Sequence, residues 1–540
     1  MPVFPTMPLT RFRVVRQKIS DSGAFFLDIA FPKKPGGRGR VTVPRGLLLD
    51  TRKARVFFAD HGATLPADCA AVFNELLEQQ APIIRVVSKT GWHHGAYLSR
   101  FGRIGGSGLN NVELDAAVKG SRERFMRGDG EAFKAAVAPL LAASPFLMLA
   151  YLAALAAPMA ASLNLTSSFA ICFSAESSTG KTSCLRLAQA LTTRADEADL
   201  ENFGNTTGIL LDALPVYGGQ AVSFGDLKAD LRSKDVVEKL RTLTFAAAGG
   251  APRQRKGEAA RPTPDFNILL FSAEAPLHDL FAASGVPFED GEAVRLLDVP
   301  VPPRDQGGIF REAEAPADLI ALLDAALRNH HGVIIKEWIG TLANYKPKVL
   351  TRDVQAQRKR FVEQLGALPA HHARIAEHFG VLAAAGALGI KSGALPLTQD
   401  TVNQALAQLF RSVVDRIGSR DVETVAAWTA FLNLVERLPI LEEGARAPMP
   451  KLAGFRRKQG TGSETVYLRR DALTELAGES VFAMIILPAL VRAGCVPATG
   501  EKTVAIAQNG LLRARYYRIS ASSLNTLRDE LAPLFARLRA

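Results

Sequence analysis

A phosphate-binding loop is the clearest chemical signal in this sequence. In the run SFAICFSAESSTGKTSCLRLAQAL, an apolar strand over Phe169–Phe173 leads into the small-residue loop Ala175–Lys181 and then into a helix. At such a turn the backbone N–H groups and the helix dipole face the phosphates of a nucleotide. Gly180 permits close approach of the chain, Lys181 reaches the β- and γ-phosphates, and the Thr182 hydroxyl is a ligand for Mg²⁺.

The pattern G-x-x-x-x-G-K-[ST] is met at every position except the first, which is Ala175. Alanine can make the turn if its φ stays negative. A chance Gly-Lys-Thr in an ordinary loop is the alternative, but the flanking strand and helix are the context that the motif requires. The sequence therefore predicts a nucleotide site formed by Glu176, Ser177, Ser178, Thr179, Gly180, Lys181 and Thr182.

A hydrolytic phosphate loop also needs a carboxylate at the end of a second strand, to hold the Mg²⁺ shell and to polarise water. Asp212 ends the run GILLD, which reads equally well as an amphipathic helix. Asp226 ends the strand-like run AVSFGD, which follows a Gly-Gly turn. We favour Asp226 as the metal-binding and catalytic carboxylate. Because Gly225 precedes it, where Asp-Glu is usual, one carboxylate has to serve both metal and water, and we expect slow hydrolysis.

Two further residues are candidates for catalysis. The strand-like run NILLFSAE ends in Ser272 and Glu274, and Ser272 at the tip of a strand beside the loop can orient the attacking water; simple strand termination is the alternative. In GEAVRLLDVP, Arg295 precedes an apolar strand. In an oligomeric ATPase an arginine here can stabilise transition-state charge on a neighbour's γ-phosphate, whereas an intrachain salt bridge is the other interpretation.

A basic loop, GGAPRQRKGEAARPTPD, precedes the strand that ends in Ser272. A loop of this kind can grip nucleic-acid phosphates inside a ring channel. An exposed charged loop without function carries equal weight. The candidate nucleic-acid contacts are Arg253, Arg255, Lys256 and Arg261.

Composition limits the class of protein. The chain has 540 residues, of which 48% are hydrophobic and 22% charged, as in folded globular proteins of about three to four domains. The net charge of +12 is compatible with a polyanionic partner without showing one. The four cysteines have no paired spacing, which argues against a disulfide framework or a Cys-based zinc site and suits a reducing cytoplasm. No apolar region follows the basic N-terminal residues, so no secretory signal is expected.

Residues 135–163 are uncharged and long enough to span a bilayer. They are rich in alanine, contain Pro139, Pro145 and Pro158, and run directly into the loop strand. We therefore expect a helix buried on all sides within a nucleotide-binding region and no membrane span.

The expected fold class is α/β, with a phosphate-loop core on a mainly parallel sheet. Short strand-like runs and turn signals predict a small β-rich domain over residues 1–90, and strand–helix alternation predicts the core over 91–305. Helical periodicity predicts a helical region over 306–445. Short helices mixed with the strand-like YYRIS predict a winged-helix-like domain over 446–540.

The order of several runs resembles the family called domain of unknown function 927. These runs are TGWHHGAYL, the apolar helix, ESSTGKTSCLRLAQAL, FSAE, GEAVRLLDVP, HARIAEHFGVLAAAGALGI, and FRRKQGTGSETVYLRR with RARYYRIS, over about residues 10–530. Members of this family look like ring-forming AAA+ ATPases. Some that are carried on mobile elements are replicative helicases related to the minichromosome maintenance group, with a C-terminal winged helix.

The resemblance implies ATP at Ser177–Thr182, Mg²⁺ at Thr182 and Asp226, a sensor at Ser272 and an Arg295 that acts on a neighbouring subunit. It implies a cytoplasmic ATP hydrolase, a DNA helicase or translocase in the replication of a mobile element or phage. It also implies a hexameric ring with a forked duplex as substrate and a single strand in its channel. The departures at Ala175 and Gly225 keep two alternatives open: an ATPase with a regulatory or defence role, and a DNA-binding scaffold that nucleotide assembles without unwinding.

Overall fold

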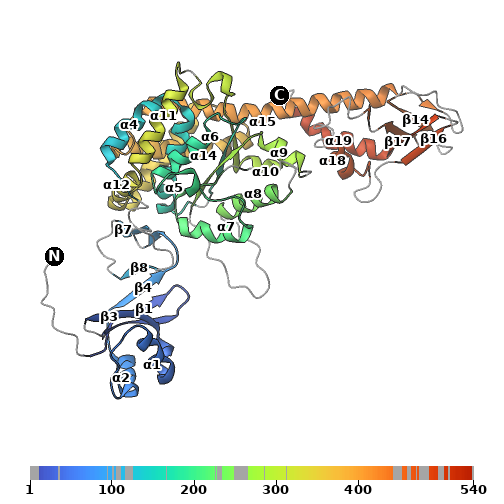
Figure 1. The fold of residues 1–540 in the computed structure, drawn as a ribbon. Coiled ribbons are helices and arrows are strands. Elements are labelled where there is room, and N and C mark those ends of the chain that lie inside the picture. Colours follow the sequence, from blue (N-terminus) through green and yellow to red (C-terminus); the bar gives the residue numbers. More distant parts are fainter. Residues whose placement is uncertain are drawn as a thin grey trace.

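The computed structural model describes residues 11–33, 37–93, 95–99, 102–104, 111–115, 126–165, 167–225, 227, 234–248, 266–284, 286, 288–311, 313–438, 440–441, 453–458, 464–469, 471–472, 486–496, 504–508 and 511–537. Figure 1 shows an N-terminal β-rich unit, a central unit of helices around a sheet, and a C-terminal unit at the far end of one long helix. The mixed α/β class predicted from the sequence is confirmed.

The N-terminal unit is built on a five-stranded sheet of order β3-β2-β1-β4-β8. Its strands are β1 (Arg13–Ser20), β2 (Phe25–Pro32), β3 (Arg38–Pro44), β4 (Ile83–Val87) and β8 (Val112–Leu114). The short helix η1 (Arg45–Leu49) leads into α1 (Thr51–Asp60), and α2 (Cys69–Glu78) follows. Alternate β2 residues such as Ile29 and Phe31 form one buried cluster with Phe58 of α1 and Phe73 of α2. This unit is therefore β-rich, with two helices on one face of the sheet.

A three-stranded sheet of β5 (Gly91–His93), β6 (Ala96–Ser99) and β7 (Gly102–Ile104) connects this unit to the central one. The indole Nε1 of Trp92 donates to the carbonyl oxygen of Pro158 at 2.8 Å. The Tyr97 hydroxyl donates to the carbonyl oxygen of Gly218 at 3.0 Å. These buried hydrogen bonds attach the small sheet to the central unit.

The central sheet has four parallel strands in the order β10-β11-β9-β12. They are β9 (Ala170–Ser174), β10 (Ala221–Ser223), β11 (Ile268–Ala273) and β12 (Leu296–Pro300). Two hydrophobic clusters share the sheet: Ile171 and Phe173 of β9 point into one, and Ala170 and Cys172 into the other. Helices cover both faces, which is why the strands read as continuous apolar runs in the sequence.

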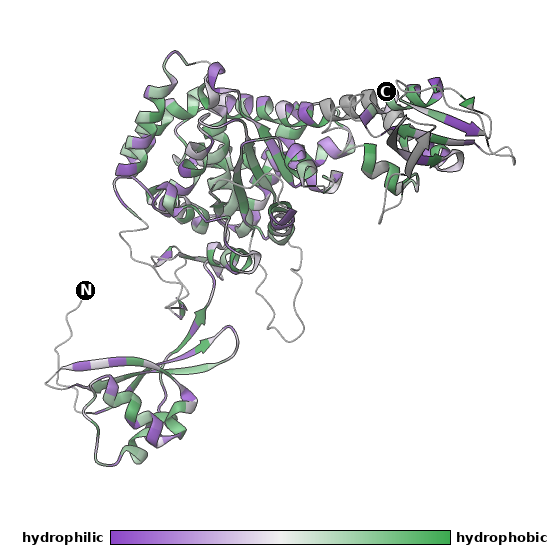
Figure 2. Cartoon of the chain, turned by 45° about the vertical axis from the view of Figure 1, so that its right-hand side comes forward, coloured by the Kyte–Doolittle hydropathy of each residue, from purple (hydrophilic) through white to green (hydrophobic). Residues whose placement is uncertain are grey.

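The elements around this sheet alternate with its strands. They are α4 (Gly130–Ala143), α5 (Pro145–Ser162), α6 (Lys181–Ala190), η2 (Glu197–Asp199), α7 (Thr207–Ala213), η3 (Leu214–Tyr217), α8 (Lys234–Ala247), α9 (Leu277–Ala283), α10 (Asp290–Ala293), η4 (Arg304–Gln306), η5 (Gly308–Phe310) and α11 (Pro316–Asn329). Figure 2 shows the strands of this sheet as mainly hydrophobic, and the helices around it as a mixture of hydrophobic and hydrophilic residues.

The apolar segment 135–163 forms two helices rather than one. Ser144 has an extended backbone and its hydroxyl accepts a hydrogen bond from Leu147 N at 3.2 Å, so it caps α5, and Pro145 takes the first helical position. Two described helices, α5 and α14 (Ala370–Ser392), are long and apolar enough to cross a membrane, but their most apolar windows are 89% and 72% buried within the protein. The prediction of an apolar helix buried inside the protein is confirmed for α5.

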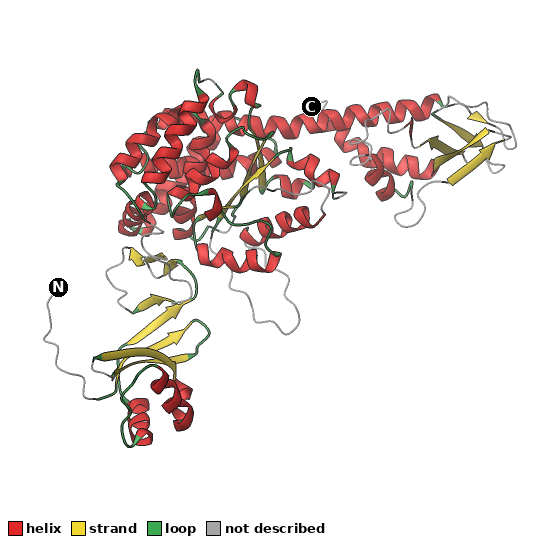
Figure 3. Cartoon of the chain, in the orientation of Figure 1, coloured by secondary structure: helices red, strands yellow, loops and turns green. Residues whose placement is uncertain are grey.

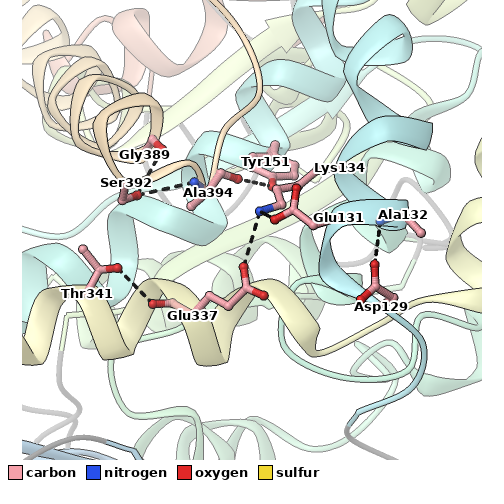
Figure 4. A network of polar contacts seen from close by, with 10 residues as sticks. All are labelled: Asp129, Glu131, Ala132, Lys134, Tyr151, Glu337, Thr341, Gly389, Ser392 and Ala394. Atoms are coloured by element: carbon pink, nitrogen blue, oxygen red, sulfur yellow. Dashed lines mark hydrogen bonds and ion pairs between the residues drawn. The ribbon is translucent and has the colours of Figure 1, made fainter.

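Polar contacts at the end of the apolar helices hold α4 against the helices that follow (Figure 4). The ammonium group of Lys134, which is almost fully buried, lies 2.5 Å from a Glu131 oxygen and 3.5 Å from Glu337 Oε2 on α12 (Val333–Asn344). Burial alone lowers the pKa of Lys134, but the hydrogen bond to Glu131 and the charge of Glu337 outweigh it and the pKa is raised. The buried Tyr151 hydroxyl donates to the Ala394 carbonyl oxygen at 2.6 Å.

Helices α13 (Pro347–Gln364), α14 and α15 (Gln399–Arg437) complete the helical part. The first half of α15 contributes Val402 and Phe410 to the central core. Its end contributes Trp428 and Phe431 to a separate core in the C-terminal unit. Figure 3 shows this one helix running from the central body to the C-terminal sheet.

The C-terminal unit has a five-stranded sheet of order β13-β14-β15-β17-β16. The strands are β13 (Ile440–Leu441), β14 (Gly454–Lys458), β15 (Glu464–Arg469), β16 (Val504–Gln508) and β17 (Leu511–Ser520), with helices α18 (Leu487–Arg492) and α19 (Ala521–Arg537). All four cysteines of the chain, in three different units, are buried free thiols.

Candidate functional site

The predicted phosphate loop lies at the carboxyl edge of the central sheet. Strand β9 ends at Ser174, and Ala175 N donates to the Ala273 carbonyl oxygen of β11 at 3.1 Å, so the loop leaves the sheet beside β11. Helix α6 begins directly after the loop, at Lys181. Because all four strands are parallel, the loop shares this edge with the ends of β10, β11 and β12. This is the edge at which open parallel sheets bind their ligands.

The loop backbone is left-handed at two positions, and only one of them is a glycine. Gly180 has φ +92° and Ser178 has φ +64°, both in the left-handed region. A Cβ on Gly180 would lie 2.7 Å from Cγ1 of Ile309, so a side chain there is excluded by contact as well as by φ. Ile309 N in turn donates to the Thr179 carbonyl oxygen at 3.0 Å. The segment η5 therefore packs against the loop and fixes its shape.

Lys181 is buried inside the loop, with 5% of its surface exposed. Its Nζ donates to the carbonyl oxygens of Ala175 and Glu176 at 2.9 and 2.6 Å, and lies 3.5 Å from Thr179 Oγ1. An ammonium group at this depth, beside the N-terminus of α6, makes the loop interior strongly favourable for an anion. On the same helix, burial raises the pKa of Cys184, which leaves that thiol protonated and unreactive.

A cavity of about 770 Å³ opens beside the first half of the loop. Its volume is in the range of sites for drug-sized and nucleotide-sized ligands. Apolar walls come from Leu141, Phe146, Met148, Leu409 and the proline-rich segment Pro300–Pro303, and polar groups come from Glu176, Glu274, Gln404, Gln408, Ser412 and Arg416. The lining thus joins the sheet edge to the start of α5 and to α15.

Arg416 of α15 is a residue at this site that the sequence analysis did not identify. Its Nη1 donates to Ser174 Oγ at 2.6 Å and lies 3.1 Å from Asp298 Oδ2. The Ser174 hydroxyl also donates to Asp298. These contacts attach α15 to Ser174, the residue immediately before the phosphate loop. Asp298 interrupts an apolar strand, which is a signal for a buried ion pair, but nothing local indicates that its partner lies on a helix more than a hundred residues later.

The candidate residues on the other strands take different positions. Ser272 is fully buried on β11, in register with Phe173 of β9. Two residues later, Glu274 lines the cavity, and it has no hydrogen-bond or ion-pair partner within the described part of the chain. Asp212 lies on helix α7, the alternative that the sequence left open for it. Strand β10 and Phe224 lead up to Gly225.

Several candidate residues fall outside the described residues. These are Asp226 and the basic-loop residues Arg253, Arg255, Lys256 and Arg261.

Arg295 lies at the opposite edge of the central sheet from the loop. It stands immediately before β12, and its carbonyl oxygen accepts a hydrogen bond from Ala170 N at the start of β9. The guanidinium group lies 5.4 Å from the centre of the Phe245 ring, and Nη1 donates to the Gly291 carbonyl oxygen at 2.8 Å. A five-residue strand of roughly 16 Å separates Arg295 from the loop of its own chain.

Comparisons with known proteins agree with this architecture. Residues 10–198 match the model of the family described as a domain of unknown function (DUF927), which confirms the sequence resemblance over that part of the chain. No curated protein matches the sequence. A solved structure described as "SCCmec type IV Cch - active helicase" superposes with a TM-score of 0.57 at 14% identity, covering 97% of this chain and 96% of the other. At this identity the likeness shows a shared fold along nearly the whole chain.

Proposed function

We propose that this protein is an ATP-dependent DNA helicase or translocase that works as a ring oligomer in the replication of a mobile element or phage.

 We expect it to be a cytoplasmic ATP hydrolase. One observation carries it: the buried Lys181 ammonium group, enclosed by a loop with a left-handed Gly180, sits at the carboxyl edge of a parallel sheet beside a cavity of about 770 Å³. The fold shared with a protein described as an active helicase supports DNA as the substrate.

The residues of the loop fit a nucleoside triphosphate with Mg²⁺. Lys181 Nζ donates to the carbonyl oxygens of Ala175 and Glu176, which are neutral, and the phosphates of ATP would offer it a stronger, charged partner. The Thr182 hydroxyl and Asp226 would hold the metal, and Ser177–Gly180 would present the backbone to the phosphates. When bound, ATP with Mg²⁺ supplies the phosphoanhydride bond whose hydrolysis drives movement.

Two residues of β11 have roles in this proposal. Glu274 lines the cavity without a hydrogen-bond or ion-pair partner among the described residues, and we assign it as the second acidic group that Gly225 does not provide. Ser272 lies on β11, the strand next to β9, and we assign it the role of orienting the attacking water at the end of β11. The basic residues Arg253, Arg255, Lys256 and Arg261 grip the DNA strand in the ring channel.

The position of Arg295 supports action between subunits. Its own loop is a full strand length away, so this guanidinium can reach only the nucleotide of a neighbouring copy. Phe245 and the Gly291 carbonyl oxygen hold it at the surface of α8 and α10. The expected assembly is a hexamer, and the four domains 1–90, 91–305, 306–445 and 446–540 are its proposed building blocks.

Strand displacement from a forked duplex tests the function directly. The full chain is expected to separate the strands with ATP and Mg²⁺, and not with a non-hydrolysable analogue. ATP hydrolysis that DNA stimulates, without any strand separation, would instead favour the regulatory or defence role that the Gly225 departure leaves open. Nucleotide-dependent assembly without phosphate release would favour the scaffold.

Mixing two inactive variants tests the action of Arg295 between subunits. Lys181→Ala and Arg295→Ala chains should each be inactive alone, whereas a mixture forms some interfaces with an intact Lys181 on one side and an intact Arg295 on the other. We expect ATPase activity to return on mixing. If the mixture stays as inactive as its components, although both variants assemble, Arg295 does not act in trans.

A further inference from the structure

The C-terminal sheet has two faces of different character. Side chains alternate along its strands, so Val466, Leu468, Tyr517 and Ile519 share one face, where they form a core with Trp428 of α15 and with residues of α18 and α19. The residues between them, among them Tyr467 and Tyr516, point to the opposite face. The hydrophobic side chains of the two faces form two separate clusters.

Three aromatic rings form the cluster on that opposite face. Phe455 of β14 stacks on Tyr467 of β15, with ring centres 4.9 Å apart and planes 18° apart. Tyr516 of β17 meets Phe455 edge-on at 5.6 Å. Within the described residues the cluster contains only these three strand residues. The three rings are buried and pack together across three neighbouring strands.

Arginines stand on the same face as the rings. Arg457 is two residues after Phe455, Arg469 is opposite Tyr516, and Arg518 is opposite Tyr467. The guanidinium of Arg457 lies 5.6 Å from the centre of the Phe455 ring, and its buried Nε has no hydrogen-bond partner among the described residues. Arg518 is exposed. We name Arg457, Arg469 and Arg518 the arginine face.

The charges on this face are mostly uncompensated. Arg469 is ion-paired with Asp471, but neither Arg457 nor Arg518 has a carboxylate partner in the described part of the chain. On the other face of the same strand, Arg456 has a different environment: it donates to the carbonyl oxygens of Leu438 and Glu436 and lies 3.8 Å from Glu464. Arg456 therefore serves the structure, whereas Arg457 and Arg518 have guanidinium groups without a carboxylate partner among the described residues.

We infer that the arginine face binds the phosphodiester backbone of DNA, as a second DNA contact far from the ATPase loop. Guanidinium groups are favoured beside aromatic rings, and they match phosphate oxygens in a bidentate manner. An ammonium group carries the same charge but lacks the planar, bidentate donor fork. The inference rests on the proposed function in one respect, the choice of DNA as the polyanion.

The experiment measures DNA binding by the full chain, without nucleotide, as a function of salt. Fluorescence anisotropy is recorded for a labelled single strand and a labelled duplex with the wild type and with the double variant Arg457→Gln/Arg518→Gln. Loss of two phosphate contacts should reduce the slope of log K against log salt by about 1.4 for the single strand or about 1.8 for the duplex. The slope that changes identifies the form of DNA bound.

Three controls keep the result unambiguous. Arg456→Gln removes a charge from the same strand but from the other face, and should leave the salt slope unchanged. Arg457→Lys/Arg518→Lys keeps the charges and should restore most of the slope. Arg518→Gln alone changes an exposed side chain, so it remains informative if the double variant does not fold.

The outcomes test DNA binding by the arginine face independently of the ATPase activity. An unchanged slope in a folded double variant, with DNA binding by the wild type intact, overturns the arginine face and leaves the proposed function standing. A wild-type chain that binds neither form of DNA overturns both. An equal loss of slope in Arg456→Gln also contradicts the inference, because general charge would then explain the binding.

Discussion

The phosphate loop and the arginine face both present positive charge to a polyanion, but they are assembled differently. The loop places Lys181 and the N-terminus of α6 together within a few consecutive residues. The arginine face takes its three side chains from β14, β15 and β17, which are more than sixty residues apart at the extremes. The loop also buries its cation, whereas Arg518 is exposed. A buried site made from consecutive residues can therefore be specific for a small anion. A surface assembled from several strands suits an extended polyanion.

Removal of the buried cation should give the largest effect. Lys181→Ala is expected to lower ATPase activity on the order of 1,000-fold, because it removes the positive charge inside the loop. Lys234→Ala is a matched control, since Lys234 also begins a helix but is exposed and forms an ion pair with Glu238. Phosphate release from purified chains measures both. A Lys181→Ala chain as active as Lys234→Ala would remove the loop from the mechanism.

Acid should destabilise the central unit while leaving the C-terminal unit almost unaffected. His378 is stacked on Phe169 at 4.5 Å, and burial lowers its pKa from 6.5 to about 4. The unfolded chain therefore takes up a proton between these values that the folded chain does not. The stability present above pH 6.5 is lost as the pH falls towards 4, by about 3 kcal/mol.

Urea unfolding at pH 7 and pH 4.5 measures this effect. The chain has no histidine after His378, so a transition of the C-terminal core should move little over the same range. His378→Phe keeps a stacked ring without a titrating group and should flatten the pH dependence. The explanation fails if the variant loses stability with acid as steeply as the wild type.

A side chain at Gly180 should weaken nucleotide binding by about 2 kcal/mol, or roughly 30-fold. The left-handed φ alone costs an alanine about 1–2 kcal/mol, and the contact with Ile309 adds to it. Gly393→Ala is the control, because Gly393 also has a positive φ but has open space around its Cβ position. Calorimetric titration with ATP and Mg²⁺ measures the affinities. Equal weakening in both variants would show that general destabilisation is the cause.

Restoring glycine at the first motif position should change little. The residues in the loop with a positive φ are Ser178 and Gly180, and Ala175 is not one of them. Ala175→Gly should therefore alter the affinity for ATP by less than about 1 kcal/mol, with a small loss of stability from backbone entropy. A gain of 10-fold or more in affinity would show that the Ala175 departure does limit the site. The same titration decides this.

The features of this protein that could be predicted from the sequence are those whose geometry depends on neighbouring residues. The strand, loop and helix around Ala175–Thr182 follow from consecutive residue types, and the apolar runs of β9 and β11 indicated a buried parallel sheet before any contact was known. The helix of Asp212 was one of two readings that periodicity allowed. These features depend on backbone preferences and hydrophobic patterns within about ten residues.

The tertiary structure alone decided which distant side chains meet. Arg416 reaches Ser174 across 242 positions of sequence, and Ile309 closes on Gly180 from a different segment. The split of the apolar segment at Ser144 and the aromatic cluster of Phe455, Tyr467 and Tyr516 depend likewise on the packing of whole elements. Such contacts are set by the sum of many weak interactions across the core, and no short run of residues encodes that sum.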